Sequence, residues 1–219
     1  MTIAENLARI RSDIADACRQ AGRAPTSVRL VAASKAQPAA AIREATLAGH
    51  VVFGENYARE MRNKKLELAT ISGPNIEWHF IGRVQASNAK DIATAALVHG
   101  IGSVEQARAL AKRAPVRGLL QLSLWDETTK NGFTQEELQR DLDVLRKIEG
   151  LTIMGLMAMP PADVDARKAF AKVREVRDRI APDLKELSMG MSADFRDAIL
   201  EGATLVRVGT ALFGARVKP

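Results

Sequence analysis

The chain has 219 residues, of which 47% are hydrophobic and 26% are charged, as in a globular protein with a well-sized core. Its formal net charge is +6, but the basic residues are dispersed among acidic ones, and aromatic residues make up only 4%. A single-strand nucleic-acid binder needs a basic groove with interleaved aromatic side chains, so we expect no nucleic-acid partner.

The first expected element is a helix over residues 3–20, where apolar residues recur at helical spacing. Cys18, the only cysteine, shares the apolar face of this helix, so we expect a buried thiol and no disulfide. The segment carries acidic residues and does not resemble a signal peptide, and no apolar run reaches the length of a membrane span. We therefore expect a cytoplasmic location and no membrane partner.

Eight short apolar runs follow, separated by segments with helical spacing. The runs cover residues 28–34, 50–55, 76–82, 95–102, 116–124, 151–159, 186–191 and 204–209. Most are apolar throughout, which is typical of parallel strands that are buried on both faces. Strands that alternate with helices indicate βαβ units, and eight of them predict a single (β/α)8 TIM barrel over residues 1–219 with an extra N-terminal helix. The alternative is an open, doubly wound sheet.

Polar residues stand at the ends of several of these runs. The active site of a (β/α)8 barrel lies at the carboxyl ends of its strands, so these residues are expected to share one site. In chain order they are Lys35, Glu55, Asn56, His79, Ser192, Arg207 and Thr210, with Gly209 between the last two.

The last two strands end in segments that suit an anion. Ser192 is expected to open one helix, and Gly209 and Thr210 the next, and helix starts present unpaired N–H groups to anions. The alternatives are a plain N-cap at Ser192 and a tight turn at Gly209. Arg207 is expected to point into the barrel, either in an internal ion pair or as a donor facing an anion or a ring nitrogen.

Lys35 follows the first strand, which lies beside the eighth strand in a closed barrel. A lysine among apolar neighbours loses its charge more readily, and its free amine can attack a carbonyl group. A lysine opposite an anion site suits an aldehyde that carries a phosphate, such as pyridoxal 5′-phosphate (PLP). The residues alone also suit another phosphorylated substrate.

Several segments together resemble the pyridoxal phosphate homeostasis protein family, the single-domain relatives of the alanine racemase barrel. They are LVAASKAQP, FGENYARE, EWHFIG, GLMAMPP and LSMGMSADFRDAILEGATLVRVGTALFGAR, in this order over residues 28–216. The segment 83–90 departs from the family's usual pattern. The resemblance implies a (β/α)8 barrel with PLP as a Schiff base on Lys35.

The resemblance also implies roles for the other residues. Ser192 and the backbone of Gly209 and Thr210 would contact the phosphate, and Arg207 would lie near the pyridine nitrogen. Asn56, His79 and Met191 would contact the ring or form the wall of its pocket.

The family resemblance implies intracellular PLP homeostasis, with effects on amino-acid balance and PLP-dependent apoenzymes as recipients. We expect a monomer or weak homodimer, no metal, and no efficient catalysis beyond a weak side activity. A racemase needs a second acid–base group, which an additional β domain supplies in the racemase relatives, and the sole tyrosine, Tyr57, is poorly placed for this role. The alternatives are a racemase or decarboxylase completed by a partner, and a cofactor-free basic binder of anions or nucleic acid.

Overall fold

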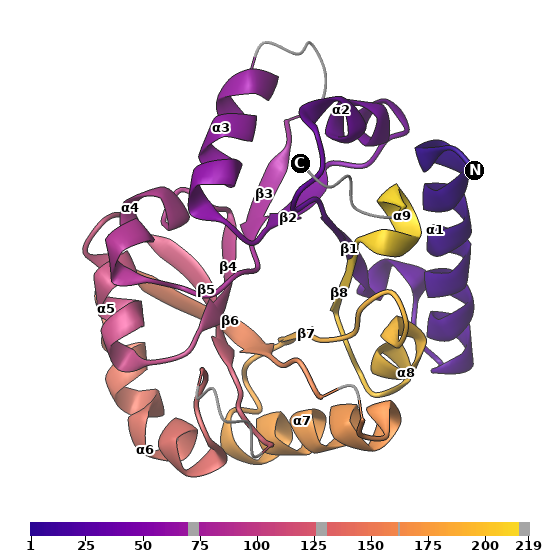
Figure 1. Cartoon of the computed structure of the whole chain (residues 1–219). Helices are drawn as coiled ribbons and strands as arrows, with labels where there is room; N and C mark the ends of the chain where they lie inside the picture. The colour runs from indigo at the N-terminus through magenta and orange to yellow at the C-terminus, as the bar shows by residue number, and fades with distance from the viewer. Residues whose placement is uncertain (70–74, 126–130, 162, 215–219) are drawn as a thin grey trace.

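The computed structural model describes residues 1–69, 75–125, 131–161 and 163–214. Eight parallel strands close into a barrel in the order β1 to β8, and helices surround it (Figure 1). The strands are β1 Arg29–Ala33, β2 Val52–Glu55, β3 Glu77–Phe80, β4 Leu97–Ile101, β5 Val116–Gln121, β6 Leu151–Met157, β7 Glu186–Ser188 and β8 Leu205–Val208. The barrel has the architecture that the sequence predicted.

The helices of the described residues follow the expected alternation. They are α1 Ile3–Gln20, α2 Ala39–Leu47, α3 Ala58–Leu68, α4 Ala89–Ile92, α5 Val104–Ala111, α6 Gln135–Arg146, α7 Ala166–Ile180, α8 Phe195–Leu200 and α9 Thr210–Phe213, with short 3-10 turns at Pro25–Ser27 and Ala86–Asn88. None of the helices in these parts of the chain is long and apolar enough to cross a membrane.

Pairing between the first and last strands closes the barrel. Val31 of β1 lies in register with Arg207 of β8, and Leu30 with Val206. The open, doubly wound sheet considered from the sequence is therefore wrong. Closure also places the carboxyl end of β1 beside that of β8, which brings distant parts of the chain to one end of the barrel.

The strands are buried on both faces, which explains their continuous apolar runs. Phe53, Phe80 and Val206 point outward into a core shared with the helices, whereas Val31 and Leu205 belong to a separate cluster inside the barrel. Successive side chains of a strand point to opposite faces, so β1, β2, β4, β5, β6 and β8 each contribute to both clusters.

Helix α1 packs outside the barrel beside α8 and α9 (Figure 1). Thr2 begins it with a capping box, in which its hydroxyl accepts from the N–H of Glu5 while the Glu5 carboxylate accepts from the N–H of Thr2. The predicted apolar face is buried, including the thiol of Cys18.

Candidate functional site

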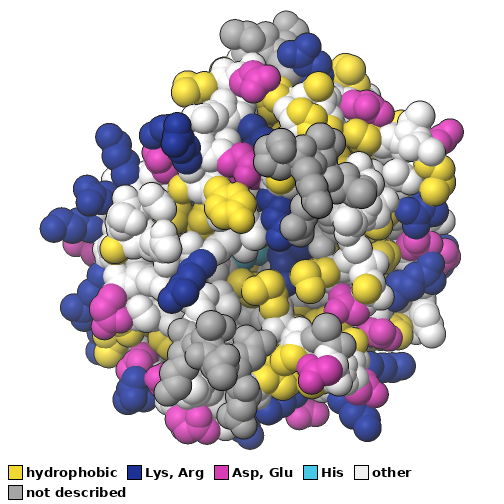
Figure 2. Space-filling view, in the orientation of Figure 1, with side chains coloured by type: hydrophobic (Ala, Val, Ile, Leu, Met, Phe, Trp, Pro, Cys, Tyr) yellow, Lys and Arg dark blue, Asp and Glu magenta, His cyan; other side chains and the backbone are white. Residues whose placement is uncertain are grey.

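One cavity at the carboxyl end of the barrel collects seven of the eight residues to which the family resemblance gave a role. It has a volume of about 300 Å³ and is lined by Lys35, Asn56, Met191, Ser192, Arg207, Gly209 and Thr210, together with apolar groups such as Ile81 and Met159. Figure 2 shows this face, where Lys and Arg side chains lie in a central hollow with hydrophobic side chains around it. The volume lies at the lower end of the range of roughly 300–1,000 Å³ that is typical of small-molecule sites.

Lys35 occupies a tight turn that directly follows β1. The lysine is half-buried, between the fully buried Ser34 and the exposed Ala36. Ala36 has a φ of 57°, in the left-handed region that costs a non-glycine residue roughly 1–2 kcal/mol. Lys35 lines the cavity, and the residue that follows it adopts a backbone conformation that needs support from neighbouring residues.

Two hydroxyl groups of the cavity lining lie close together. Thr210 Oγ1 lies 3.4 Å from Ser192 Oγ, so the connections that follow β7 and β8 converge here. Gly209 precedes α9, whose first N–H groups have no intrahelical partner. A Cβ atom on Gly209 would lie 3.1 Å from the Ala33 carbonyl oxygen, so glycine allows this connection to approach β1 closely.

The position of Ser192 differs from the prediction that it opens a helix. Helix α8 begins at Phe195 and its N-cap residue is Asp194. The Asp194 carboxylate accepts a hydrogen bond of 2.6 Å from the Met191 N–H and so stabilises the turn before the helix. Ser192 lies three residues before the first residue of α8, so it is not the N-cap, and it lines the cavity.

Arg207 points into the barrel, as the sequence predicted. Its guanidinium donates to the Ser188 carbonyl at 2.8 Å, to Ser188 Oγ at 2.6 Å and to the Ala158 carbonyl at 3.1 Å. Burial lowers the pKa of Arg207 to about 10, and Asp194 opposes this shift. The side chain is therefore still a cation near neutral pH, held by backbone and hydroxyl oxygens at the edge of the cavity.

His79 is the one of these eight residues that does not line the cavity, and Glu55 of β2 does not line it either. It lies fully buried inside the barrel, with Nδ1 2.9 Å from His99 Nε2 and Nε2 2.9 Å from Glu77 Oε1. Its side chain faces the barrel axis, but the strand places it below the cavity rather than in its wall. The expected contact between His79 and a ligand ring stays a prediction, and His79 is not among the residues that line the cavity.

A hydrogen-bond chain links His79 to Arg207. His99 Nδ1 lies 2.8 Å from Ser188 Oγ, which also accepts from Arg207. Burial keeps the pKa of His99 well below its usual value, so this ring is neutral. At the far end, the bond from His79 lowers the pKa of Glu77 to about 2, and Arg29 adds to the effect. This series of hydrogen bonds orients Arg207 from inside the barrel.

The sequence did not single out three other residues that belong to this region. Gln37 lines the cavity, and Lys64 and Glu60 of α3 contact the turn that carries Lys35. Lys64 had a detectable signal, since it shares a helical face with the buried Met61 and Leu68. A lysine on a buried helix face needs a polar partner, and here that partner is the cluster described below.

A larger cavity of about 590 Å³ lies over the adjacent β4 and β5 strands, lined by residues that include Ser103, Trp125 and Lys172. None of the predicted site residues borders it. The chemistry-bearing residues of the strand ends therefore converge on the smaller cavity.

A parallel barrel that carries a lysine after its first strand and two hydroxyls after its last two is of the alanine racemase type. The family model described as alanine racemase, N-terminal domain, matches residues 6–217. The alanine racemase from E. faecalis has this fold, with a TM-score of 0.67 and 16% identity over all of this chain and 61% of the racemase.

The chain belongs to the pyridoxal phosphate homeostasis protein family. It is 41% identical to the family member from Pseudomonas aeruginosa over 98% of this chain and 96% of that protein. It is 36% identical to the Escherichia coli member over 98% and 97%. The structure of PipY from Synechococcus elongatus with PLP bound has a TM-score of 0.84 and 36% identity, covering 97% of this chain and 100% of PipY.

Proposed function

We propose that the chain binds PLP in the 300 Å³ cavity, as a Schiff base with Lys35, and serves PLP homeostasis. The observation that carries the proposal is that one cavity brings Lys35 together with the Ser192–Thr210 hydroxyl pair. The family relationship and the PLP-bound structure of PipY support it. PLP supplies an aldehyde, which condenses with an amine to form a C=N bond and release one water molecule.

The phosphate is assigned to the connections that follow β7 and β8. Ser192 and Thr210 offer hydroxyl donors, and the first N–H groups of α9, near Gly209 and Thr210, have no intrahelical partner. The dipoles of these groups favour an anion. The close approach of Gly209 to β1 keeps this anion site near Lys35.

Arg207 is assigned to the pyridine nitrogen of the cofactor. A guanidinium is a donor only, and the pKa of about 10 keeps it protonated near neutral pH. A ring nitrogen that faces such a donor accepts a hydrogen bond and does not take up a proton. An unprotonated ring withdraws electrons weakly, which suits a protein that binds the cofactor rather than one that uses it in catalysis.

Asn56 and Met191 are assigned to the sides of the ring. The buried Oδ1 of Asn56 has no hydrogen-bond partner among the described residues, and such a group calls for one. A donor on the bound ring would satisfy it. Met191, with Met159 and Ile81, supplies apolar surface for the ring faces.

We also propose that the chain lacks efficient turnover. Among the described residues that line the cavity, only Lys35 and Arg207 carry ionisable side chains. Racemisation needs a second acid–base group on the opposite face of the cofactor, and an arginine with a pKa of about 10 is a poor one. Tyr57 is 64% exposed and does not line the cavity.

Binding of PLP without turnover of an amino acid fits a role in storing PLP in the cytoplasm and passing it to apoenzymes that require it. Such a role would affect amino-acid balance. A monomer or a weak homodimer is sufficient for this role, since the proposed contacts all come from one chain.

The test is to load the purified protein with PLP, record its visible spectrum, reduce it with borohydride and map the modified peptide. We expect a chromophore typical of a Schiff base and a single adduct on Lys35. Lys35→Met should lose both, whereas Lys90→Met, which changes an exposed lysine, should retain them. An adduct elsewhere, or none, would refute the proposal, and rapid turnover of an amino acid would refute the non-catalytic role.

A further inference from the structure

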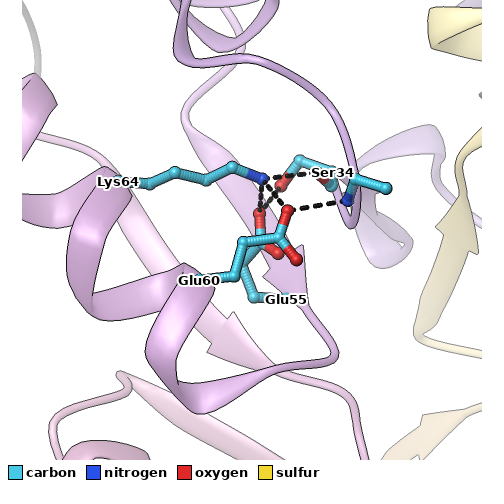
Figure 3. Close-up of polar contacts among 5 residues, drawn as sticks. Ser34, Glu55, Glu60 and Lys64 are labelled. Carbon is cyan, nitrogen blue, oxygen red and sulfur yellow. Dashed lines mark hydrogen bonds and ion pairs between the residues drawn. The ribbon is translucent and has the colours of Figure 1, made fainter. Parts of the chain in front are cut away.

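A buried charged cluster contacts the turn that carries Lys35, and none of its residues lines the cavity. The Lys64 cluster consists of Ser34, Glu55, Glu60 and Lys64 (Figure 3). The Lys64 ammonium donates to Glu55 Oε1 at 2.7 Å, to Glu60 Oε1 at 2.6 Å and to the Ser34 carbonyl at 2.7 Å. These three bonds use all three of its hydrogens.

The cluster holds the peptide groups on both sides of Lys35. Lys64 binds the carbonyl of Ser34, which precedes Lys35, and Glu60 Oε1 accepts a bond of 2.7 Å from the N–H of Ala36, which follows it. Both side chains come from α3, one turn apart. Ser34 Oγ donates to Glu55 Oε1 at 2.6 Å, which adds a third link to the turn.

Stability alone does not explain such a cluster. The side chains of Lys64 and Glu55 are 7% and 0% exposed, and the cost of desolvating buried charges often cancels their attraction. Burial raises the pKa of Glu55 while Lys64 opposes the shift, and Glu55 Oε2 has no partner among the described residues. The contacts are directional, however, and they hold Ala36 in its left-handed conformation.

We propose that Glu60 and Lys64 are positioning residues for Lys35, which fix both flanking peptide groups and so present the Lys35 amine to the cavity before the cofactor enters. The proposal rests on the proposed function, because it assigns these residues to Schiff-base formation. In that step the neutral amine adds to the aldehyde carbon and one water molecule leaves. A preorganised turn lowers the entropic cost of reaching the reactive geometry.

The test separates covalent capture from binding. Stopped-flow absorbance gives the rate of Schiff-base formation after PLP is added to the cofactor-free protein. Calorimetry gives the Kd of pyridoxine 5′-phosphate, which carries the ring and phosphate but an alcohol in place of the aldehyde. Hydrogen exchange of the Ala36 amide, followed by NMR, reports on the turn without any cofactor.

Glu60→Leu removes the acceptor of the Ala36 N–H. We expect the Ala36 amide to exchange about ten-fold faster and Schiff-base formation to slow about ten-fold, while the Kd changes by less than about two-fold. Lys64→Met should act in the same direction. Glu60→Gln keeps an acceptor and should stay within about three-fold of the unmodified rate. Glu67→Leu, an exposed change on the same helix, is the matched control and should change nothing.

An unchanged rate in Glu60→Leu would overturn the proposal. A parallel loss of rate and of pyridoxine 5′-phosphate affinity would also overturn it, because general loosening of the site would then explain both. If Lys64→Met does not fold, the two Glu60 variants decide the question. If the unmodified protein forms no Schiff base on Lys35, the proposed function fails together with this proposal, even where the Ala36 amide is protected.

Discussion

At the scale of single residues, Arg207 shows how the barrel keeps a charge in its interior. Its three hydrogen bonds go to oxygens of Ser188 and Ala158, and the hydroxyl of Ser188 connects it to His99. A buried arginine must be hydrogen-bonded or paired, and here backbone and hydroxyl oxygens meet most of this need. A guanidinium fixed in this way can donate a hydrogen bond to a ligand in the cavity without moving.

Ser192→Ala tests the anion site at the residue scale. A hydrogen bond to a charged group contributes roughly 1.5–3 kcal/mol, so we expect the Kd for PLP to rise about ten-fold or more while Lys35 still forms the Schiff base. Dialysis followed by absorbance measures cofactor retention, and borohydride trapping measures the covalent bond.

Ser103→Ala is the matched control, since Ser103 caps α5 through the Gln106 N–H and borders the other cavity. It should lower the free energy of unfolding by about 1 kcal/mol and leave retention unchanged. Unchanged retention in Ser192→Ala would contradict the assignment of the phosphate.

At the scale of elements, α1 supports the short helix that carries Thr210. Helix α9 spans only Thr210–Phe213, and a helix of one turn is not stable by itself in water. Asn6 Nδ2 donates to the Leu212 carbonyl at 3.0 Å, and Arg9 Nη2 donates to the Ala211 carbonyl at 3.2 Å. The extra N-terminal helix therefore holds part of the proposed phosphate site from outside the barrel.

Asn6→Ala removes one of these bonds. We expect the free energy of unfolding to fall by about 1 kcal/mol and the Kd for PLP to rise about three-fold, because α9 becomes less ordered. Urea unfolding and PLP titration measure the two quantities.

The control is Arg11→Ala on the same helix, whose guanidinium binds the Gly49 carbonyl at 2.7 Å, away from α9. It should lower stability without changing PLP affinity. If both variants weakened PLP binding equally, α1 would act only through overall stability.

At the scale of the whole molecule, buried histidines make stability depend on pH. His50 is 5% exposed, and its Nε2 lies 2.8 Å from the Val52 carbonyl, so it donates there as a neutral ring. Burial lowers the pKa of His50 to about 4, and Arg11 adds to the shift although the Val52 bond opposes it. His99 is shifted in the same direction.

We expect the free energy of unfolding to fall as the pH drops from about 6.5 to about 4. Over this range the unfolded chain protonates His50 while the folded chain does not, so protons favour unfolding. The contribution of His50 is roughly 3 kcal/mol at full effect. Urea unfolding between pH 4 and pH 8 measures it.

His50→Gln should reduce the dependence of the free energy of unfolding on pH over this range, even if it lowers stability at neutral pH. If the free energy of unfolding of this variant depended on pH as strongly as that of the unmodified protein, groups other than His50 would cause the loss of stability in acid. Glu77 acts only at lower pH: its depressed pKa of about 2 gives stability that is present above its unfolded pKa and is lost as the pH falls towards 2.

The sequence by itself determined the order of strands and helices, because apolar periodicity is a local property of the chain. It also brought Lys35, Arg207 and Ser192 into one hypothesis, because the carboxyl ends of parallel strands meet at one end of a closed barrel. The roles of these residues toward PLP remain proposals, while the barrel itself and the family are established.

Only the tertiary structure decided which neighbouring polar residues serve the cavity. Asn56 lines it whereas the adjacent Glu55 points to α3, and His79 faces the barrel axis yet lies outside the cavity. Asp194, not Ser192, is the N-cap residue of α8. These outcomes depend on strand register and on contacts between residues far apart in sequence, which local patterns do not encode. The Lys64 cluster, which joins α3 to the turn after β1, arises for the same reason.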